Sequence, residues 1–447
     1  MIEPSVPLRP KLRKYLNADA LYRLVYGEFT KIFDVRVGDV KISVADASMS
    51  ALAMFLLKDP SVLAFDERRK TDQNLGSIYH IGIIPSDTQM RTILDDVDPV
   101  DLRSAYKVIF RQLQRGKILE SFVFLEDCYL LSLDGTGIYS SHKIRSDACL
   151  VKTNSKTGEK TYSLQMLGAA LIHPDRSEVI PLVPEMITKQ DGETKNDCER
   201  NAARRFVERF RKEHPFLPVI VTEDALSPNA PHIRDLQTHN VHYILGVKPG
   251  DHQFLFDYVR LAHEEGLTTE HEIVDPIRVD VRHRFRFLTD VPLNKSNLDV
   301  HVHFVEYWEI SPEGIKHFTW VTDIVPTPDN VYLIMRGGRA RWKIENETFN
   351  TLKNQGYHLG HNYGLGKKNL GLVFTILMML AFLIDQTQQI GCPLFRSVWK
   401  KLGSKRALWE AMRSVFRYFQ FDSMEMLYRA LLHGIKFKSP ELLLDSS

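Results

Sequence analysis

The stretch that most constrains the fold is an uninterrupted apolar run, LGLVFTILMMLAFLI, at residues 370–384. This run is shorter than the roughly 20 residues that span a bilayer, and Asp385 follows it directly. We therefore expect a helix that is buried on all sides within a large core, and no membrane partner. The 447 residues of the chain are enough for such a core, divided between two or three domains.

The overall composition is that of a soluble globular protein, with 44% hydrophobic and 26% charged residues. The net charge of +2 gives no global basic field that would by itself indicate nucleic acid. Three local runs, at residues 200–212, 278–286 and 396–406, are strongly basic. Each run alone is typical of a solvated face, but three in one chain favour a polyanionic partner.

The four cysteines form no CxxC pair, so the sequence predicts neither a zinc knuckle nor a disulfide framework. A reducing cytoplasm is the simplest setting for such a chain. The first residues, MIEPSVPLRPKLRKYL, lack the apolar core of a signal peptide. We therefore expect a cytoplasmic protein.

The N-terminal quarter of the chain has helical periodicity. Ser86 and Gln89 form an S-x-x-Q capping box, which predicts a helix over residues 86–97. A preceding helix over residues 74–81 would make this pair either a DNA-reading helix-turn-helix or a plain αα-hairpin, and the plain hairpin is the favoured interpretation.

The middle of the chain changes to strands. The stretch YLLSLDGTGIYSS at 129–141 predicts two short strands around a glycine turn, with Asp134 at the end of the first. A strand pair is expected at 163–187 and a basic helix at 195–213. The strand FLPVIVTEDAL then ends at Glu223 and Asp224. Strands followed by a helix and another strand predict an α/β core.

A helix is predicted for RARWKIENETFNTLKN at residues 339–354. At about 100° per residue, one broad face carries Arg341, Trp342, Glu345, Phe349 and Leu352. Glu347 falls on the opposite face, as an ordinary solvated charge. A carboxylate among apolar side chains needs a partner or a metal. A metal-free pair between Glu345 and Arg341, four residues apart, is one explanation.

Three carboxylates are candidates for a metal site: Asp134 and Asp224 are predicted at strand ends, and Glu345 on a later helix. Hard cations such as Mg²⁺ take oxygen ligands and keep positions for water and phosphate. Two such ions, about 3.5–4 Å apart, catalyse phosphodiester chemistry. Three acidic residues brought together from distant segments would suit that reaction.

These motifs resemble those of a DDE transposase of the bacterial insertion-sequence type, in the branch with a Y-R-E-K signature. The matching stretches are LSLDGTG around Asp134, VIVTEDAL around Asp224 and RWKIEN around Glu345, and the resemblance covers roughly residues 125–390. It implies a ribonuclease H-like mixed sheet with flanking helices, a β-rich insertion, and helical N- and C-terminal regions.

The match to the signature is incomplete at two positions. The tyrosine expected three residues before Arg341 is Gly338 here. The lysine expected seven residues after Glu345 is Leu352, with Lys353 one step later. Trp308 and Trp320 are both candidates for a residue that stacks on a flipped base, and core packing is the competing explanation for each.

The resemblance implies five segments. They are a helical DNA end-binding region at 1–125, the core at 126–252 and 319–391, the β-rich insertion at 253–318, and a helical C-terminal region at 392–447 that is a candidate for dimerisation. A homodimer in a synaptic complex would bind the terminal inverted repeats of an element and join them to target DNA in the nucleoid.

The resemblance also assigns roles to individual residues. Asp134, Asp224 and Glu345 would be catalytic and would hold Mg²⁺, which Mn²⁺ could replace. Arg341 and Lys353 would contact DNA. The alternatives are a ribonuclease H-like nuclease that cleaves without joining, and a domesticated DNA-binding protein that keeps the fold.

Overall fold

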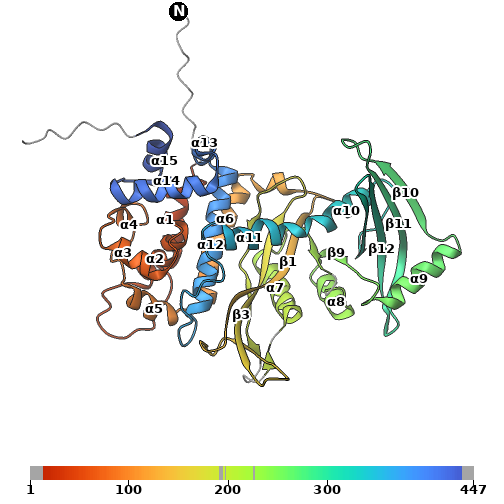
Figure 1. Cartoon of the computed structure of the whole chain (residues 1–447), viewed down its shortest axis with the longest axis horizontal. Helices are drawn as coiled ribbons and strands as arrows, with labels where there is room; N and C mark the ends of the chain where they lie inside the picture. Colours follow the sequence, from red (N-terminus) through yellow and green to blue (C-terminus); the bar gives the residue numbers. More distant parts are fainter. Residues whose placement is uncertain (1–13, 191–194, 197, 225–226, 435–447) are drawn as a thin grey trace, which may run out of the picture.

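The computed structural model of the chain describes residues 14–190, 195–196, 198–224 and 227–434 (Figure 1). The outer parts of the two predicted terminal regions, residues 1–13 and 435–447, lie outside the described residues. In Figure 1 a helical layer, the core strands and the strands of the β-rich segment follow one another from left to right.

The helical layer combines the N-terminal region with the end of the chain. Its N-terminal helices are α1 Ala18–Phe29, α2 Val44–Leu56, α3 Val62–Arg69, α4 Asn74–Ser77, α5 Asp87–Asp95 and α6 Arg103–Arg115, with 3₁₀ turns at Pro99–Leu102 and Leu119–Phe122. Its C-terminal helices are α12 Leu370–Gly391, α13 Pro393–Leu402, α14 Lys405–Tyr418 and α15 Met424–His433.

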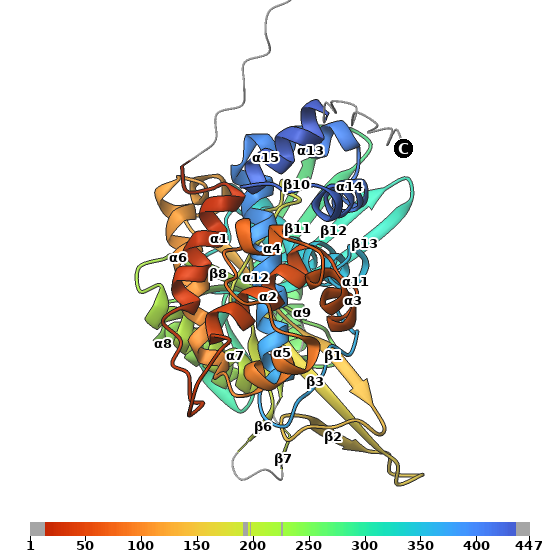
Figure 2. The same ribbon diagram turned by 90° about the vertical axis from the view of Figure 1, so that its left-hand side faces the viewer.

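Helix α12 is the buried helix that the apolar run predicts. Its length and composition would suffice to cross a membrane, but 94% of its most apolar window is buried inside the protein. In Figure 2, α12 lies in the middle of the helical layer, with α2 and α6 packed against it. Asp385 is tolerated in this helix because the buried Lys58 ammonium lies 2.6 Å from its carboxylate.

The central sheet is mixed and continuous. Its strand order is β10-β11-β12-β13-β9-β8-β1-β3-β2, with β4 and β5 also paired to β3. The core strands are β1 Tyr129–Ser141, β2 Leu150–Thr153, β3 Lys160–Ile172, β4 Ile180–Pro181, β5 Glu185–Ile187, β8 Val219–Glu223 and β9 His242–Gly246. A separate ladder pairs β6 Lys189–Gln190 with β7 Lys195–Asn196.

The directions of the strands identify the core. β3 is antiparallel to β1, whereas β8 is parallel to β1 and β9 is parallel to β8. The connecting helices are α7 Glu199–Glu213 and α8 Ala230–Thr238. This arrangement confirms the predicted mixed α/β fold and is consistent with a ribonuclease H-like core.

The β-rich segment extends the same sheet. It consists of α9 Gln253–Glu264, β10 Thr269–Val274, β11 Arg282–Asn294, β12 Asn297–Ser311 and β13 Gly314–Thr322. β13 crosses the predicted boundary at residue 318 and pairs with β9 of the core. One hydrophobic cluster runs through the described chain from Leu16 to Tyr428, so the predicted segments share a core.

Two local predictions are wrong. The stretch 129–141 forms one long strand instead of two, because β3 pairs with it along its whole length and its glycines make only a register shift after Gly137. The helix predicted over 74–81 is the single turn α4, although the capping box of Ser86 and Gln89 does begin α5. A helix-turn-helix needs two helices, so this pair does not form one.

Candidate active site

The two aspartates meet where β8 ends. Residues 129–132 of β1 pair in parallel with residues 219–222 of β8, so that Ser132 lies beside Thr222. Asp134 and Asp224 follow two residues after this pair, and both line one small cavity where the charge of Asp224 acts on Asp134. Asp134 therefore lies in the middle of its strand, and not at the end as predicted. It still lies beside the end of the neighbouring strand, which is the position that the predicted site requires.

The third carboxylate comes from the segment after β13. Helix α10, Val331–Ala340, leads through Arg341 into a π-helix, Ile344–Phe349, and then into α11, Asn350–Asn354. The hydroxyl of the buried Ser132 donates a hydrogen bond to the carbonyl oxygen of Arg341, at 3.2 Å. This bond fixes the start of the segment on β1, two residues before Asp134.

A close approach fixes the end of the π-helix. The ring of Phe349 lies directly over Gly168, which pairs with Asp134 across the β1–β3 ladder. A Cβ on Gly168 would lie 2.6 Å from Cε1 of Phe349, so only glycine admits the ring at this distance. The glycine thereby determines how closely the π-helix, which contains both Phe349 and Glu345, packs on the sheet.

The π-helix changes which side chains are buried. A π-turn holds more residues than an α-turn, so the 100° spacing used for the prediction does not apply here. Trp342 is 56% exposed, and the Glu345 side chain is 43% exposed. The prediction that Glu345 is buried between Trp342 and Phe349 is therefore wrong. Glu345 instead lies partly at the surface, close enough to Asp134 for its charge to act on that carboxyl group.

Arg341 lies between two of the three carboxylates. Its Nη1 is 2.8 Å from Oε1 of Glu345 and 3.6 Å from Oδ2 of Asp134. The pair with Glu345 is the one considered in the metal-free interpretation. Because it shares Arg341 with Asp134, the pair belongs to the same charge cluster as the aspartates.

The cluster holds more negative charge than Arg341 neutralises. Burial raises the pKa of Asp134 to about 7, and Arg341 opposes the shift while Glu345, Asp224 and Glu199 add to it. Burial is the main cause of this shift, and the three neighbouring carboxylates are the part of it that an added positive charge would relieve. Perturbed carboxyl groups of this kind are concentrated at functional sites.

Glu199 is a member of the cluster that the sequence interpretation missed. It is the first residue of α7, and its Oε1 lies against Gly135, where a Cβ would be only 2.1 Å away. Burial raises the pKa of Glu199, and Asp224 and Glu223 raise it further. The sequence offered one signal, an acidic residue at the start of a helix that is otherwise strongly basic.

The structure distinguishes between the adjacent Glu223 and Asp224. Glu223 is buried and its Oε2 lies 3.1 Å from Nε2 of the buried His232 on α8. Burial would raise the pKa of Glu223, but the charge and hydrogen bond of His232 keep it below its usual value. Glu223 thus serves to fix the end of β8, and Asp224 acts on the pKa of Asp134.

The donor set agrees with a divalent cation in its chemistry, although not yet in its placement. Asp134, Asp224 and Glu345 offer only carboxylate oxygens, which Mg²⁺ prefers. Among the residues that the structure describes, however, no three His, Cys, Asp or Glu side chains are placed so that they would ligate one ion. The guanidinium of Arg341 lies between Glu345 and Asp134, so Glu345 would have to leave it to join the aspartates.

The missing signature tyrosine has a structural explanation. A Cβ on Gly338 would lie 2.4 Å from Nε1 of Trp320, so the indole occupies the space where a larger side chain would begin. Trp320 is buried and stacks on Phe318, which makes it a core residue.

Trp308 is partly exposed and stacks on His317. Lys353 lies exposed on α11, and its contact with phosphate stays a prediction.

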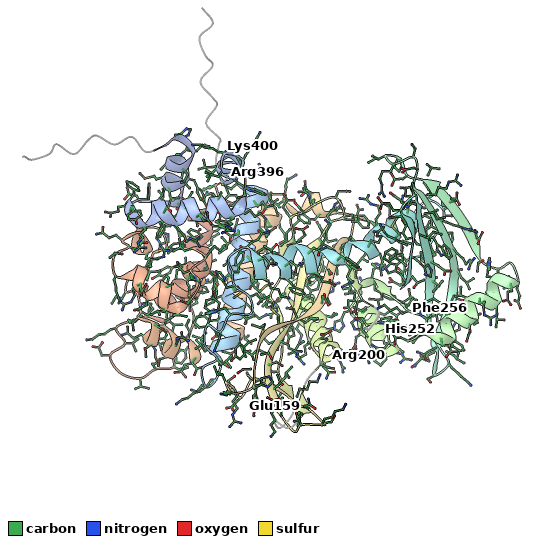
Figure 3. All side chains as sticks on the ribbon, in the orientation of Figure 1. Glu159, Arg200, His252, Phe256, Arg396 and Lys400 are labelled. Atoms are coloured by element: carbon green, nitrogen blue, oxygen red, sulfur yellow. The ribbon has the colours of Figure 1, made fainter. Side chains whose placement is uncertain are left out.

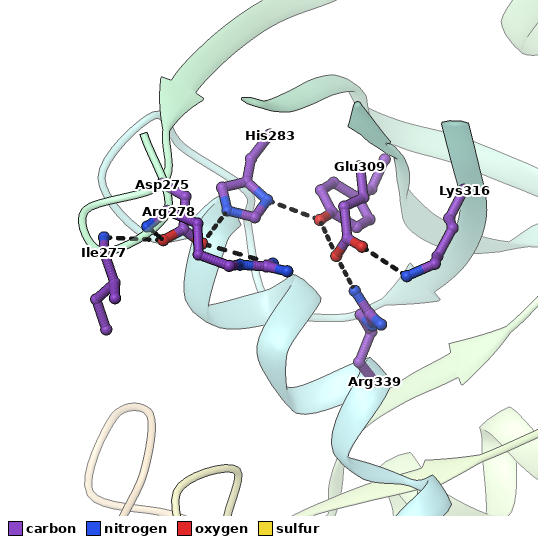
Figure 4. Close-up of polar contacts among 8 residues, drawn as sticks. Asp275, Ile277, Arg278, His283, Glu309, Lys316 and Arg339 are labelled. Atoms are coloured by element: carbon purple, nitrogen blue, oxygen red, sulfur yellow. Dashed lines mark hydrogen bonds and ion pairs between the residues drawn. The ribbon is translucent and has the colours of Figure 1, made fainter. Parts of the chain in front are cut away.

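A polar chain ties the β-rich segment to α10 (Figure 4). Nε2 of His283 lies 3.0 Å from Asp275, and its Nδ1 lies 2.7 Å from the hydroxyl of Tyr307. That hydroxyl donates to Glu309 at 3.4 Å, and Glu309 also accepts a hydrogen bond from Arg339. Because Arg339 stands two positions before Arg341, the insertion supports the helix that carries the site.

In the part of the chain that the structure describes, the three basic runs do not join into one face. On β11, the side chains of Arg282, Arg284 and Arg286 are paired with glutamates. The other two basic runs lie apart, as Figure 3 shows for Arg200 on α7 and for Lys400 on α13. The run on α7 begins beside the carboxylate cluster.

No family model matches the chain, and no curated protein matches it. Among solved structures, the chain is similar to one in the cryo-EM structure of the piggyBac transposase synaptic complex with hairpin DNA. The TM-score is 0.42 and the sequence identity 10%, over 96% of this chain and 86% of that chain. A likeness at this level carries no argument about the site.

Proposed function

We propose that the chain is a DDE transposase that cleaves DNA at the terminal inverted repeats of its own element and joins the ends to target DNA. The observation that carries this proposal is the meeting of Asp134, Asp224 and the Arg341–Glu345 pair at the end of β8. The three stretches that resemble transposase motifs thus come from distant parts of the chain and converge at one place. The protein would act as a homodimer on nucleoid DNA in the cytoplasm.

The residues would divide the work as follows. Asp134, Asp224 and Glu345 would hold divalent cations, which supply activation of the attacking oxygen and stabilisation of the leaving oxygen. Arg341, already beside two of the carboxylates, would move to a phosphate oxygen when Glu345 turns toward the aspartates. Lys353, exposed on the following helix, would contact the DNA backbone.

The test is a strand-transfer reaction with a labelled duplex that carries the inverted repeats flanking the gene. We expect Mg²⁺-dependent cleavage at the repeat ends and joining of the 3′ ends to a second DNA. Cleavage without joining would favour the nuclease without strand transfer. Specific binding of the repeats without cleavage would favour the domesticated DNA-binding protein that keeps the fold.

A further inference from the structure

An exposed apolar segment follows α1. Phe33, Val35 and Val37 are 80%, 56% and 101% exposed, and they alternate with the partly exposed Asp34 and Arg36 in a stretch that forms neither helix nor strand. In Figure 2 the red chain after α1 runs along the outer edge of the helical layer. The described hydrogen bonds include none from the main chain of these three residues. They therefore expose both apolar side chains and main-chain N–H and C=O groups that are available for hydrogen bonds.

The segment is held in this conformation from its inner side. Arg36 donates to both carboxylate oxygens of Asp34, at 2.8 and 2.6 Å, and to the carbonyl oxygen of Ile42, at 2.7 Å. Asp34 and Arg36 are only partly exposed, whereas the three apolar residues face outward. An exposed segment with unpaired main-chain groups can serve as a template on which another segment pairs as a β-strand.

The sequence of the segment is complementary to itself. In an antiparallel pair centred on Val35, Phe33 faces Val37 of a second copy, and Asp34 faces Arg36. In the same register Lys31 falls at the level of Asp39. Opposite charges and apolar residues thus pair at every position from 33 to 37, and such cross-strand pairs stabilise a sheet.

The neighbouring registers fail. Centring the pair on Asp34 or on Arg36 sets two like charges directly opposite each other, which destabilises a sheet. A shift by a single residue would place charged side chains opposite apolar ones. The sequence therefore selects the register centred on Val35, which has the two-fold symmetry of a homodimer contact.

We propose that residues 33–37 form an antiparallel strand pair with the same segment of a second copy of this chain. A five-residue pair buries less area than a stable dimer needs, so the free protein associates weakly. Any third component that binds both copies would raise the effective concentration of each segment around the other and so strengthen their contact.

The test introduces one exposed cysteine into each variant, leaves the buried Cys128, Cys149 and Cys392 in place and uses no DNA, so its outcome does not depend on the proposed reaction. In a Cys198→Ser background, Val35→Cys should form a disulfide-linked dimer under mild oxidation, because each residue 35 faces its copy. Phe33→Cys should not, because two copies of residue 33 lie four residues apart along the pair, about 13 Å. A mixture of the Phe33→Cys and Val37→Cys proteins should cross-link.

Sedimentation velocity of the full chain provides a second measurement. Val35→Lys sets two lysines opposite each other and should weaken self-association at least tenfold. Val279→Lys, at an even more exposed apolar position on the insertion, should leave it unchanged. Equal cross-linking of the Phe33→Cys and Val35→Cys proteins, or self-association that survives Val35→Lys, would overturn the proposal.

Discussion

Replacing Gly168 with alanine should disable the site without any change to its charged residues. The new Cβ would lie 2.6 Å from Cε1 and 2.8 Å from Cζ of Phe349, whereas carbon atoms prefer about 3.5–4.0 Å. The ring must therefore retreat by about 1 Å and carry the π-helix with it. We expect a loss of about 1–3 kcal/mol in the free energy of unfolding from overpacking. We also expect cleavage to fall by about 100-fold, because Glu345 is misplaced.

The assays are urea unfolding and cleavage of a labelled end duplex. Gly137→Ala is the matched control, because it lies on β1 and a Cβ there meets nothing within 4 Å. Adding Phe349→Leu to Gly168→Ala should restore part of the stability, since the two positions are in contact. If Gly168→Ala cleaves DNA as well as Gly137→Ala does, the packing of Phe349 on Gly168 does not position Glu345 for catalysis.

Three further predictions concern individual side chains. Glu345→Gln should abolish cleavage while the free energy of unfolding changes by about 0.5 kcal/mol or less, because the ion pair is partly exposed, and Glu347→Gln should cleave normally. The folded pKa of Asp134, about 7, lies above its unfolded value of 3.8, so its contribution to stability is complete below about pH 4 and is lost as the pH rises through 7. In metal-free buffer, wild type should therefore lose stability relative to Asp134→Asn between pH 4 and 8, and parallel curves would contradict this. Glu309→Gln should lose about 1–3 kcal/mol in urea unfolding, because Arg339 and Tyr307 lose a charged acceptor, and an unchanged midpoint would exclude that role.

The elements that the sequence predicted well are those fixed by local pattern. The apolar run became the buried α12, and the strand before Asp224 ended where its two acidic residues begin. The convergence of Asp134 with Asp224 required the parallel pairing of β1 with β8, which motif resemblance implied and periodicity alone did not.

The elements that the sequence did not predict depend on partners from elsewhere in the chain. Whether DGTG turns or continues a strand is decided by β3, which pairs with β1 on both sides of Gly137. The π-helix around Glu345 has no periodic signature, and Gly168 reveals its role only when Phe349 is seen above it. Glu199 joins the site only because α7 begins beside Gly135.

The most direct test of the carboxylate site is a titration of the metal-free protein with Mn²⁺, followed by electron paramagnetic resonance of the free ion. The account predicts saturable binding by wild type and by Glu347→Gln, loss of binding by Asp134→Asn and Asp224→Asn, and weaker binding by Glu345→Gln. Undiminished binding by Asp134→Asn, or no saturable binding by wild type, would contradict it.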